Sequence, residues 1–262
     1  MKTYLDEMVS KIETESYIQD DPVQFMHAYE RKEDQEIAGF FAAIMAWGRR
    51  DIVINKVDDL LGRMNYRPYD FILNFSESDV DIISDFKHRT FKPIDLYWFF
   101  RILQNIYTNH SDFEAFWAKC YHRSQLSLRP LIAVFHEEFF SIYPETPQRS
   151  RKHISNPEKN SSSKRLYMYL RWCLRKGSPV DLGIWDFMPV SEIKIPLDVH
   201  VSNIAKRMGL LTRTYDDWKA VNELNERLLK FDKNDPSKYD YALFGIGVLS
   251  RQIPTQFLIN QK

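Results

Sequence analysis

An aspartate and a histidine stand at the start of a predicted helix in IPLDVHVSNIAKRMGLL, residues 195–211. Pro196 favours extended backbone just before it, Asp198 takes the usual N-cap position, and apolar residues at helical spacing continue to Gly209. The helix dipole and the backbone N–H groups favour the ionised form of such an aspartate. Asp198 could therefore stabilise a cation developing on a substrate, or act only as a cap. His200, in the first turn, could contact a phosphate from the same helix end.

A lysine begins a second predicted helix, KRLYMYLRWCLRK, residues 164–176. The helix dipole disfavours a cation in the first turn, and we expect Arg165 and partial burial to act in the same direction on Lys164. A nucleophilic lysine reacts as the neutral amine, so this position suits covalent chemistry. Ser162 and Ser163, just before it, could cap the helix or hold a phosphate. The alternative is that Lys164 is a solvated charge beside a loop.

The same helix is the most basic in the chain. Helical spacing puts one stripe on Lys164, Met168, Arg171 and Arg175, and a separate buried stripe on Leu166, Leu170, Cys173 and Leu174. Residues 149–176 hold nine lysines and arginines against one acid, although the whole chain balances 36 basic with 36 acidic residues. We therefore predict a local basic face for nucleic acid, including Arg165, Arg171, Arg175 and Lys176.

Several other chemistries are excluded by what the sequence lacks. Two cysteines, Cys120 and Cys173, are too few for an iron–sulfur cluster or an all-cysteine zinc site, and we expect buried free thiols. The HEEFF segment at 136–140 lacks the second histidine of a zinc-binding helix, and no G-x-S-x-G or glycine-rich phosphate loop occurs. We expect neither a metal nor a cofactor.

Apolar residues recur at helical spacing in segments 37–45, 52–61 and 96–106, whereas strand alternation is scarce. Only eight glycines occur, and there is no Asn-Gly or Asp-Gly pair for hairpin turns. The fold is predicted to be all-α, with about ten or more helices. The polar segment 144–163 is predicted to be the longest loop and a break between two lobes of a single domain, residues 1–262.

The N-terminus is charged, and no apolar run is long enough to cross a bilayer. We therefore expect a soluble, cytoplasmic, monomeric protein without membrane partners.

The segment IPLDVHVSNIAKR resembles one in helix-hairpin-helix DNA glycosylases, especially the 8-oxoguanine type, in which a Pro-x-Asp-x-His run opens a helix and the aspartate is catalytic. Those enzymes place a lysine at the start of the helix that follows the hairpin, and Lys164 is the matching position. The resemblance implies a two-lobed all-α fold with Lys164 as nucleophile and Asp198 as its catalytic partner.

A second similarity lies in FFAAIMAWGRRDIVINKVDDLL, residues 40–61, which resembles the glycosylase helix pair; its matching residues are Asp51, Asn55 and Lys56. Gly48 stands where the family often has a glutamine that fills the hole left by a flipped base. Trp47, Arg49 or Arg50 could take that role, and we include both arginines among the predicted nucleic-acid-binding residues.

The glycine-rich hairpin of the glycosylases is replaced by HISNPEKNSSSK, so its grip on DNA is altered or lost. The separation of Lys164 and Asp198 is long, as in the archaeal 8-oxoguanine branch. Together, KRLYMYLRWCLR, DLGIW, PLDVH and DPSKYDYALFGIG also resemble an uncharacterised bacterial family of unknown function; in the last motif we expect Asp235 and Pro236 to begin a helix with a structural role.

We expect a base-excision repair glycosylase that cleaves the bond to a damaged base through a lysine Schiff base, with possible β-lyase activity. Its partner would be damaged duplex DNA, with RNA also open. The alternative is a non-catalytic nucleic-acid-binding protein that keeps the glycosylase-like fold.

Overall fold

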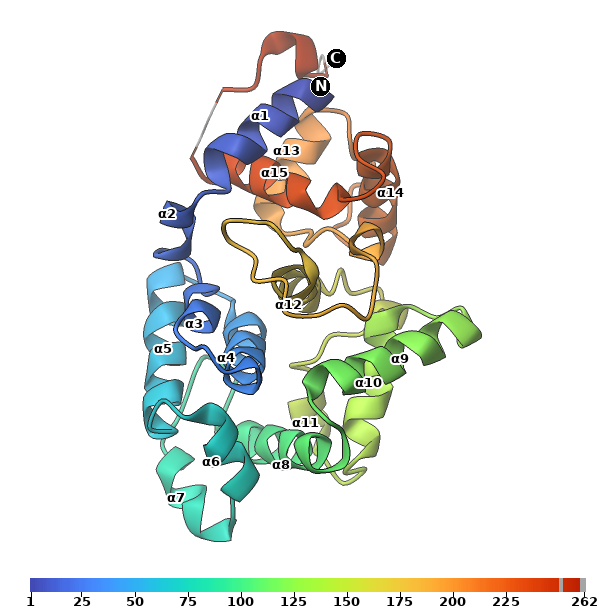
Figure 1. The fold of residues 1–262 in the computed structure, drawn as a ribbon. Coiled ribbons are helices and arrows are strands. Elements are labelled where there is room, and N and C mark those ends of the chain that lie inside the picture. Colours follow the sequence, from blue (N-terminus) through green and yellow to red (C-terminus); the bar gives the residue numbers. More distant parts are fainter. Residues whose placement is uncertain (250–251, 260–262) are drawn as a thin grey trace. The chain divides into compact units, whose positions relative to one another are not determined.

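The computed structural model describes residues 1–249 and 252–259, and in these ranges it is all-helical, with two isolated β-bridges and no strand (Figure 1). The predicted all-α class is confirmed. The chain divides into two compact units, unit 1 (Met1–Gln19 and Pro157–Lys262) and unit 2 (Asp20–Asn156). No helix in the described ranges is long and apolar enough to cross a membrane.

Unit 2 is built around α4 (Lys32–Met45), whose residues from Glu36 to Met45 are all buried. Phe40 of α4 contacts the rings of Phe99, Phe113 and Phe135. A helix that is apolar on nearly every side must be enclosed, which explains why others surround it. The other elements of unit 2 are α3 (Gln24–His27), α5 (Arg50–Arg63), α6 (Pro68–Asn74), α7 (Val80–Ile83), α8 (Pro93–Asn109), α9 (Phe113–Ser127), α10 (Leu131–Ser141) and α11 (Gln148–Arg151), with the 3₁₀ turn η1 (Glu77–Asp79).

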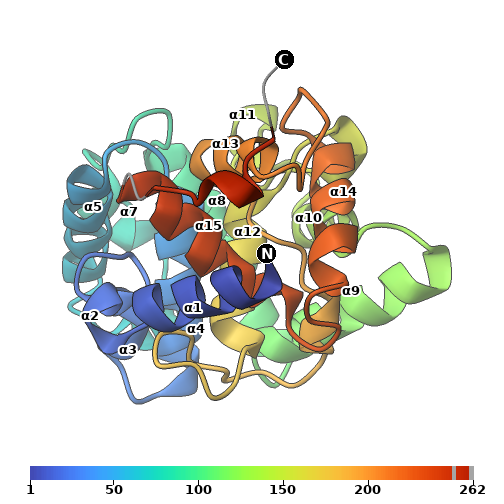
Figure 2. The same ribbon diagram turned by 90° about the horizontal axis from the view of Figure 1, so that it is seen from above.

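Unit 1 joins the first helices of the chain to the last ones. Its helices are α1 (Lys2–Ile12), α2 (Glu15–Ile18), α12 (Lys164–Leu174), α13 (Val199–Arg207), α14 (Trp218–Leu229) and α15 (Tyr239–Val248), with the 3₁₀ turns η2 (Pro157–Lys159), η3 (Val190–Glu192), η4 (Pro236–Lys238) and η5 (Thr255–Phe257). Helix α15 packs against both α1 and α13, and Figure 2 shows α1 crossing beside it. A Cβ atom on Gly245 of α15 would lie 2.8 Å from Ile12 of α1, so the glycine permits this close approach.

The predicted helical segments are confirmed, since 37–45 lies in α4, 52–61 in α5 and 96–106 in α8. The polar segment 144–163 differs from the prediction because it contains α11 and η2. Elements of one turn have no room for a periodic pattern, and prolines at 147 and 157 mark their starts instead. The junction between the units at 156–157 falls within this segment, whereas the junction at 19–20 had no predicted counterpart.

Candidate active site

Asp198 is the N-cap of α13, as predicted. One carboxylate oxygen, Oδ1, accepts a hydrogen bond of 2.8 Å from the Val201 backbone N–H, and the Asp198 carbonyl accepts the Ser202 N–H at 2.9 Å. Gly209 follows the helix with φ +71°, in the left-handed conformation expected after a helix end. Asp198 is partly exposed, so this capping aspartate is also accessible to solvent.

Lys164 is the first residue of α12 and is exposed, so the expectation that it is partly buried is wrong. It forms no hydrogen bond or ion pair with any residue in the described ranges. The turn before it forms without glycine, because Asn160 (φ 61°) and Ser163 (φ 51°) both adopt left-handed backbone conformations. Such conformations are unfavourable for side chains other than glycine and asparagine, so Ser163 holds the greater strain.

Ser163 does not cap α12 with its side chain, which was one of the two roles predicted for it. Ser163 is only 2% exposed, its hydroxyl has no hydrogen-bond partner within the described part of the chain, and its side chain does not cap the helix. Its backbone N–H instead donates to the Ser161 hydroxyl oxygen at 3.2 Å. Ser163 therefore cannot contact a nucleic acid unless this turn opens, whereas Ser162 is partly exposed.

The predicted surface stripe on α12 is wrong at two positions. Arg171 is 2% and Arg175 6% exposed. Arg171 pairs with Asp240, and its Nε lies 3.4 Å from Asp181. Arg175 pairs with Asp181 and with Glu13 at 2.7 Å. Neither guanidinium is available to a phosphate, because carboxylates distant in sequence neutralise both inside unit 1.

These two arginines and their acids form a buried network. The guanidinium carbon of Arg171 lies 4.1 Å from the centre of the Tyr241 ring, and the Tyr241 hydroxyl donates to Asp181 at 2.6 Å. Asp235 accepts from Arg175 at 2.9 Å and also caps η4, where Pro236 follows as expected. The DPSKYDYALFGIG motif therefore has the structural role expected of it.

Asp240, in the same motif, is a residue that sequence reasoning missed. It is 9% exposed on α15 and binds Arg171. Burial raises the pKa of Asp240 to about 7; Arg171 opposes this rise, and the negative charges of Asp198 and Asp181 add to it. The helical periodicity of apolar residues could not predict the burial of Asp240, because an acidic residue is assigned to the exposed side of a helix.

Packing between α13 and α15 places Asp240 near the start of α13. The ring of His200 meets that of Phe244 edge to face, with centroids 5.8 Å apart, and a Cβ on Gly247 would lie 3.1 Å from the His200 Cβ. Positions 240, 244 and 247 share one face of α15, which the first turn of α13 covers. His200 itself is exposed beside Asp198.

Lys164 and Arg171 share a face of α12, seven residues and about 10 Å apart along the axis. Arg171 binds Asp240 of α15, and α15 packs against α13. The face of α12 that carries Lys164 is therefore the face turned toward Asp240.

The remaining predicted nucleic-acid-binding residues lie in varied settings. Burial lowers the pKa of Arg165 to about 10, which leaves it charged at neutral pH. Lys176 is exposed and pairs with Asp186 at 2.6 Å. In the basic region 149–176, at least four of the nine cations are thus paired with carboxylates, namely Arg149, Arg171, Arg175 and Lys176. The excess of positive charge is smaller at the surface than the sequence indicates.

Arg49 and Arg50 lie in unit 2, at the turn between α4 and α5. Arg49 is exposed and binds Asp51 at 2.6 Å. Gly48 before them has φ +107°, and a Cβ there would collide with Arg89. This turn needs glycine, which accounts for Gly48 without reference to a flipped base.

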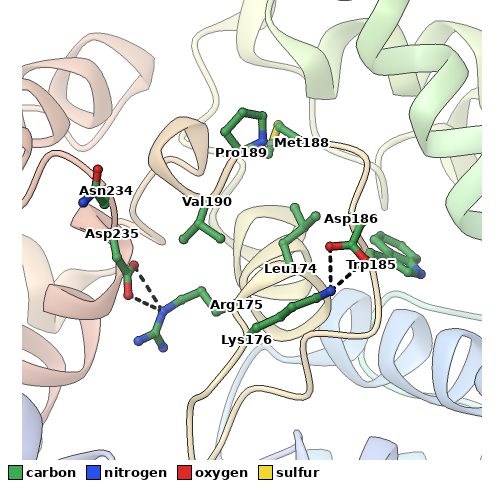
Figure 3. A pocket seen from close by; sticks show the side chains of 10 residues that line it. All are labelled: Leu174, Arg175, Lys176, Trp185, Asp186, Met188, Pro189, Val190, Asn234 and Asp235. Carbon is green, nitrogen blue, oxygen red and sulfur yellow. Dashed lines mark hydrogen bonds and ion pairs between the residues drawn. The ribbon is translucent and has the colours of Figure 1, made fainter.

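A pocket of about 520 Å³ lies in unit 1 at the C-terminal end of α12. Figure 3 shows its two ion pairs, Arg175 with Asp235 and Lys176 with Asp186, to either side of Leu174. Its other lining residues are Trp185, Met188, Pro189, Val190 and Asn234. Lys164 begins the opposite end of the same helix, so this pocket does not contain the candidate lysine.

No group of histidine, cysteine or acidic side chains within residues 1–249 and 252–259 is arranged to hold a metal ion. Cys120 and Cys173 are buried free thiols, as expected, and burial raises the pKa of Cys120 to about 12.

Comparison with known families gives one match. The model of the family described as "Protein of unknown function (DUF2400)" matches residues 21–249. No curated protein and no solved structure matches the chain.

Proposed function

The chain belongs to this family of unknown function, and we propose from its own residues that it is a DNA N-glycosylase that excises a damaged base through a lysine Schiff base. Lys164 is the proposed nucleophile and Asp198 the proposed charge-stabilising acid. Ser162 and His200 are the proposed contacts to the DNA backbone beside them.

One observation carries this proposal, which is that α15 links α12 to the start of α13. Lys164 shares its helix face with Arg171, Arg171 binds Asp240 of α15, and α15 packs against the first turn of α13, which Asp198 caps. Lys164 is also unpaired with any described carboxylate, at a helix end that disfavours a cation. Unit 1 thus has an exposed amine at the start of α12 and a partly exposed acid at the start of α13, and these are the two groups that the chemistry requires.

In the proposed reaction the neutral Lys164 amine attacks the sugar C1′ while the C1′–N bond breaks, and its electron pair leaves with the base. The attacking nitrogen loses one proton, and the departing base gains one. The sugar ring then opens as the C1′–O4′ bond breaks, O4′ takes a proton, and a protonated Schiff base joins C1′ to Lys164. Asp198 stabilises the positive charge on the sugar while the base departs.

Borohydride trapping on duplexes carrying a panel of base lesions tests this proposal, because reduction of the Schiff base leaves a permanent crosslink. We expect a crosslink with the wild-type protein and none with Lys164→Gln. Lys176→Gln, which removes an exposed lysine at the far end of α12, is the matched control and should keep the crosslink. Absence of a crosslink with every lesion, in DNA and in RNA, would contradict the proposal.

Asp198→Asn separates the acid's charge from its capping role. Asparagine caps a helix about as well as aspartate, so the fold of α13 should be retained. Loss of the charge should lower the single-turnover excision rate by about 10²–10³-fold. An unchanged rate with an unchanged circular dichroism spectrum would show that Asp198 is only a cap.

A non-catalytic nucleic-acid-binding protein is the second candidate, favoured by the exposure of Lys164 and by the position of the pocket at the other end of α12. This candidate predicts binding to undamaged DNA that weakens steeply with salt and without a crosslink. Lys164→Gln would then reduce the affinity for all sequences about equally.

A further inference from the structure

We propose that Asp240 is a positioning residue for the reaction proposed above: held by Arg171 inside unit 1, it sets the charge that surrounds Asp198. This inference rests on the proposed function. Asp240 does not present its carboxylate to a substrate, since it is 9% exposed and Arg171 binds it. Its influence on a substrate must therefore pass through Asp198.

The charged and titratable groups that act on the Asp240 carboxyl come from α12, from the start of α13 and from the segment between α12 and η3. Arg171 of α12 binds it directly, Asp198 stands at the start of α13, and Asp181 lies in the segment between α12 and η3. Asp181 is shared with Arg175 and accepts the Tyr241 hydroxyl, so its charge is already balanced. As pH changes, the group near Asp198 whose net charge varies is therefore the Arg171–Asp240 pair.

The two states of Asp240 give Asp198 different surroundings. Burial, partly offset by Arg171, raises the pKa of Asp240 to about 7. Below that pH the carboxyl is neutral, and the Arg171 charge is left to offset the negative charge of Asp198. Above it, Asp240 neutralises Arg171, and the full Asp198 charge can act on a cationic sugar. We therefore expect excision to become faster as pH rises through the pKa of Asp240.

A substrate-free measurement tests the electrostatic link. Carboxyl ¹³C resonances of the full-length protein would be followed by NMR against pH, in the wild type and in Asp198→Asn. Removal of the like charge should lower the pKa of Asp240 by roughly one unit. The control Asp186→Asn removes an acid from the exposed far end of α12 and should leave this pKa unchanged. An unchanged Asp240 titration in Asp198→Asn would overturn the inference.

A second measurement tests the effect on the reaction. The single-turnover rate should show an inflection at the Asp240 pKa in the wild type and in Asp186→Asn, and this inflection should be lost in Asp240→Asn. Retention of the inflection in folded Asp240→Asn would overturn the inference.

The NMR arm leaves Asp240 intact and so remains decisive if Asp240→Asn does not fold. The two proposals fail in different ways. A Lys164-dependent crosslink without electrostatic coupling would overturn only the role of Asp240. Coupling without any crosslink would overturn the proposed function and with it the catalytic consequence of the coupling.

Discussion

The two units bury carboxylates in different ways. In unit 2, Asp95 and Glu36 are fully buried and accept hydrogen bonds from backbone N–H groups at the starts of α8 and α9. Asp95 also accepts the Ser150 hydroxyl at 2.6 Å, and Glu36 accepts the Tyr107 hydroxyl at 2.9 Å. The cations beside these acids, Arg149 at 3.1 Å from Asp95 and Lys32 at 3.9 Å from Glu36, are about one third exposed. Neutral donors at helix starts therefore share the cost of burying these acids with cations that remain in contact with solvent.

In unit 1 the buried acids are matched with buried cations. Asp181 and Asp240 meet Arg171 and Arg175, and Arg171 Nε has no hydrogen bond among the described residues. Such a network depends on the balance of whole charges, so the loss of one member leaves another charge uncompensated. The stability of unit 1 should therefore depend more strongly on single charge changes and should fall as pH rises toward neutrality. The stability of unit 2 should fall in acid.

The largest expected effect is that of Arg171→Met. It leaves Asp240 and Asp181 buried with one cation fewer, which should cost about 3–5 kcal/mol of unfolding free energy. Hydrogen–deuterium exchange of peptides from each unit would locate the loss in unit 1. The double variant Arg171→Met/Asp240→Leu should recover part of the stability.

Lys176→Met is the matched control for this variant, because it breaks an exposed ion pair worth less than about 1 kcal/mol. Equal losses for Lys176→Met and Arg171→Met would refute a special dependence of unit 1 on its buried cations.

Asp95→Asn probes the corresponding site in unit 2 and should cost about 2 kcal/mol, because hydrogen bonds to a charged acceptor are lost. Although burial acts to raise it, hydrogen bonds from His153 and Ser150 hold the pKa of Asp95 below its ordinary value. The stabilisation is therefore present above the unfolded pKa of about 3.9 and disappears as pH falls through the folded value.

Urea denaturation at several pH values would measure this cost, which should be constant near neutrality and shrink only in acid. Asp240 should behave oppositely: its raised folded pKa makes its stabilisation complete below about pH 4 and lost as pH rises through about 7. If Asp95→Asn and Asp240→Asn changed the unfolding free energy over the same pH range, the distinction between the units would be removed.

The smallest expected effects come from two glycines in helices. Gly245→Ala places a methyl group 2.8 Å from Ile12, and overpacking of α1 against α15 should cost about 1–3 kcal/mol. In Gly62→Ala, in α5 of unit 2, the added methyl group meets the Tyr66 side chain at ordinary contact distances, 3.4 Å from its hydroxyl, and the variant should be more stable by about 0.5–1 kcal/mol. Thermal denaturation of both variants would check the signs, and stabilisation by Gly245→Ala would contradict the close packing described for unit 1.

Local patterns predicted much of the fold and little of the site. Helical periodicity and the Asp198 cap depend on residues within a few positions of one another, so both were visible in the sequence. The burial of Arg171 was not, because Asp181 and Asp240 reach it from 10 and 69 positions away. Periodicity assigns an arginine to the surface, and only the folded chain reveals the acids that bring it inside.

The pairing of α1 with α15 also bears on how the protein is made. Unit 2 is one continuous stretch and can fold as soon as it leaves the ribosome, whereas unit 1 must wait until its last helices are synthesised. During that interval the apolar side of α1, with Leu5, Met8 and Ile12, lacks the surface that later covers it. Nascent chains should therefore be most prone to chaperone capture through their first dozen residues.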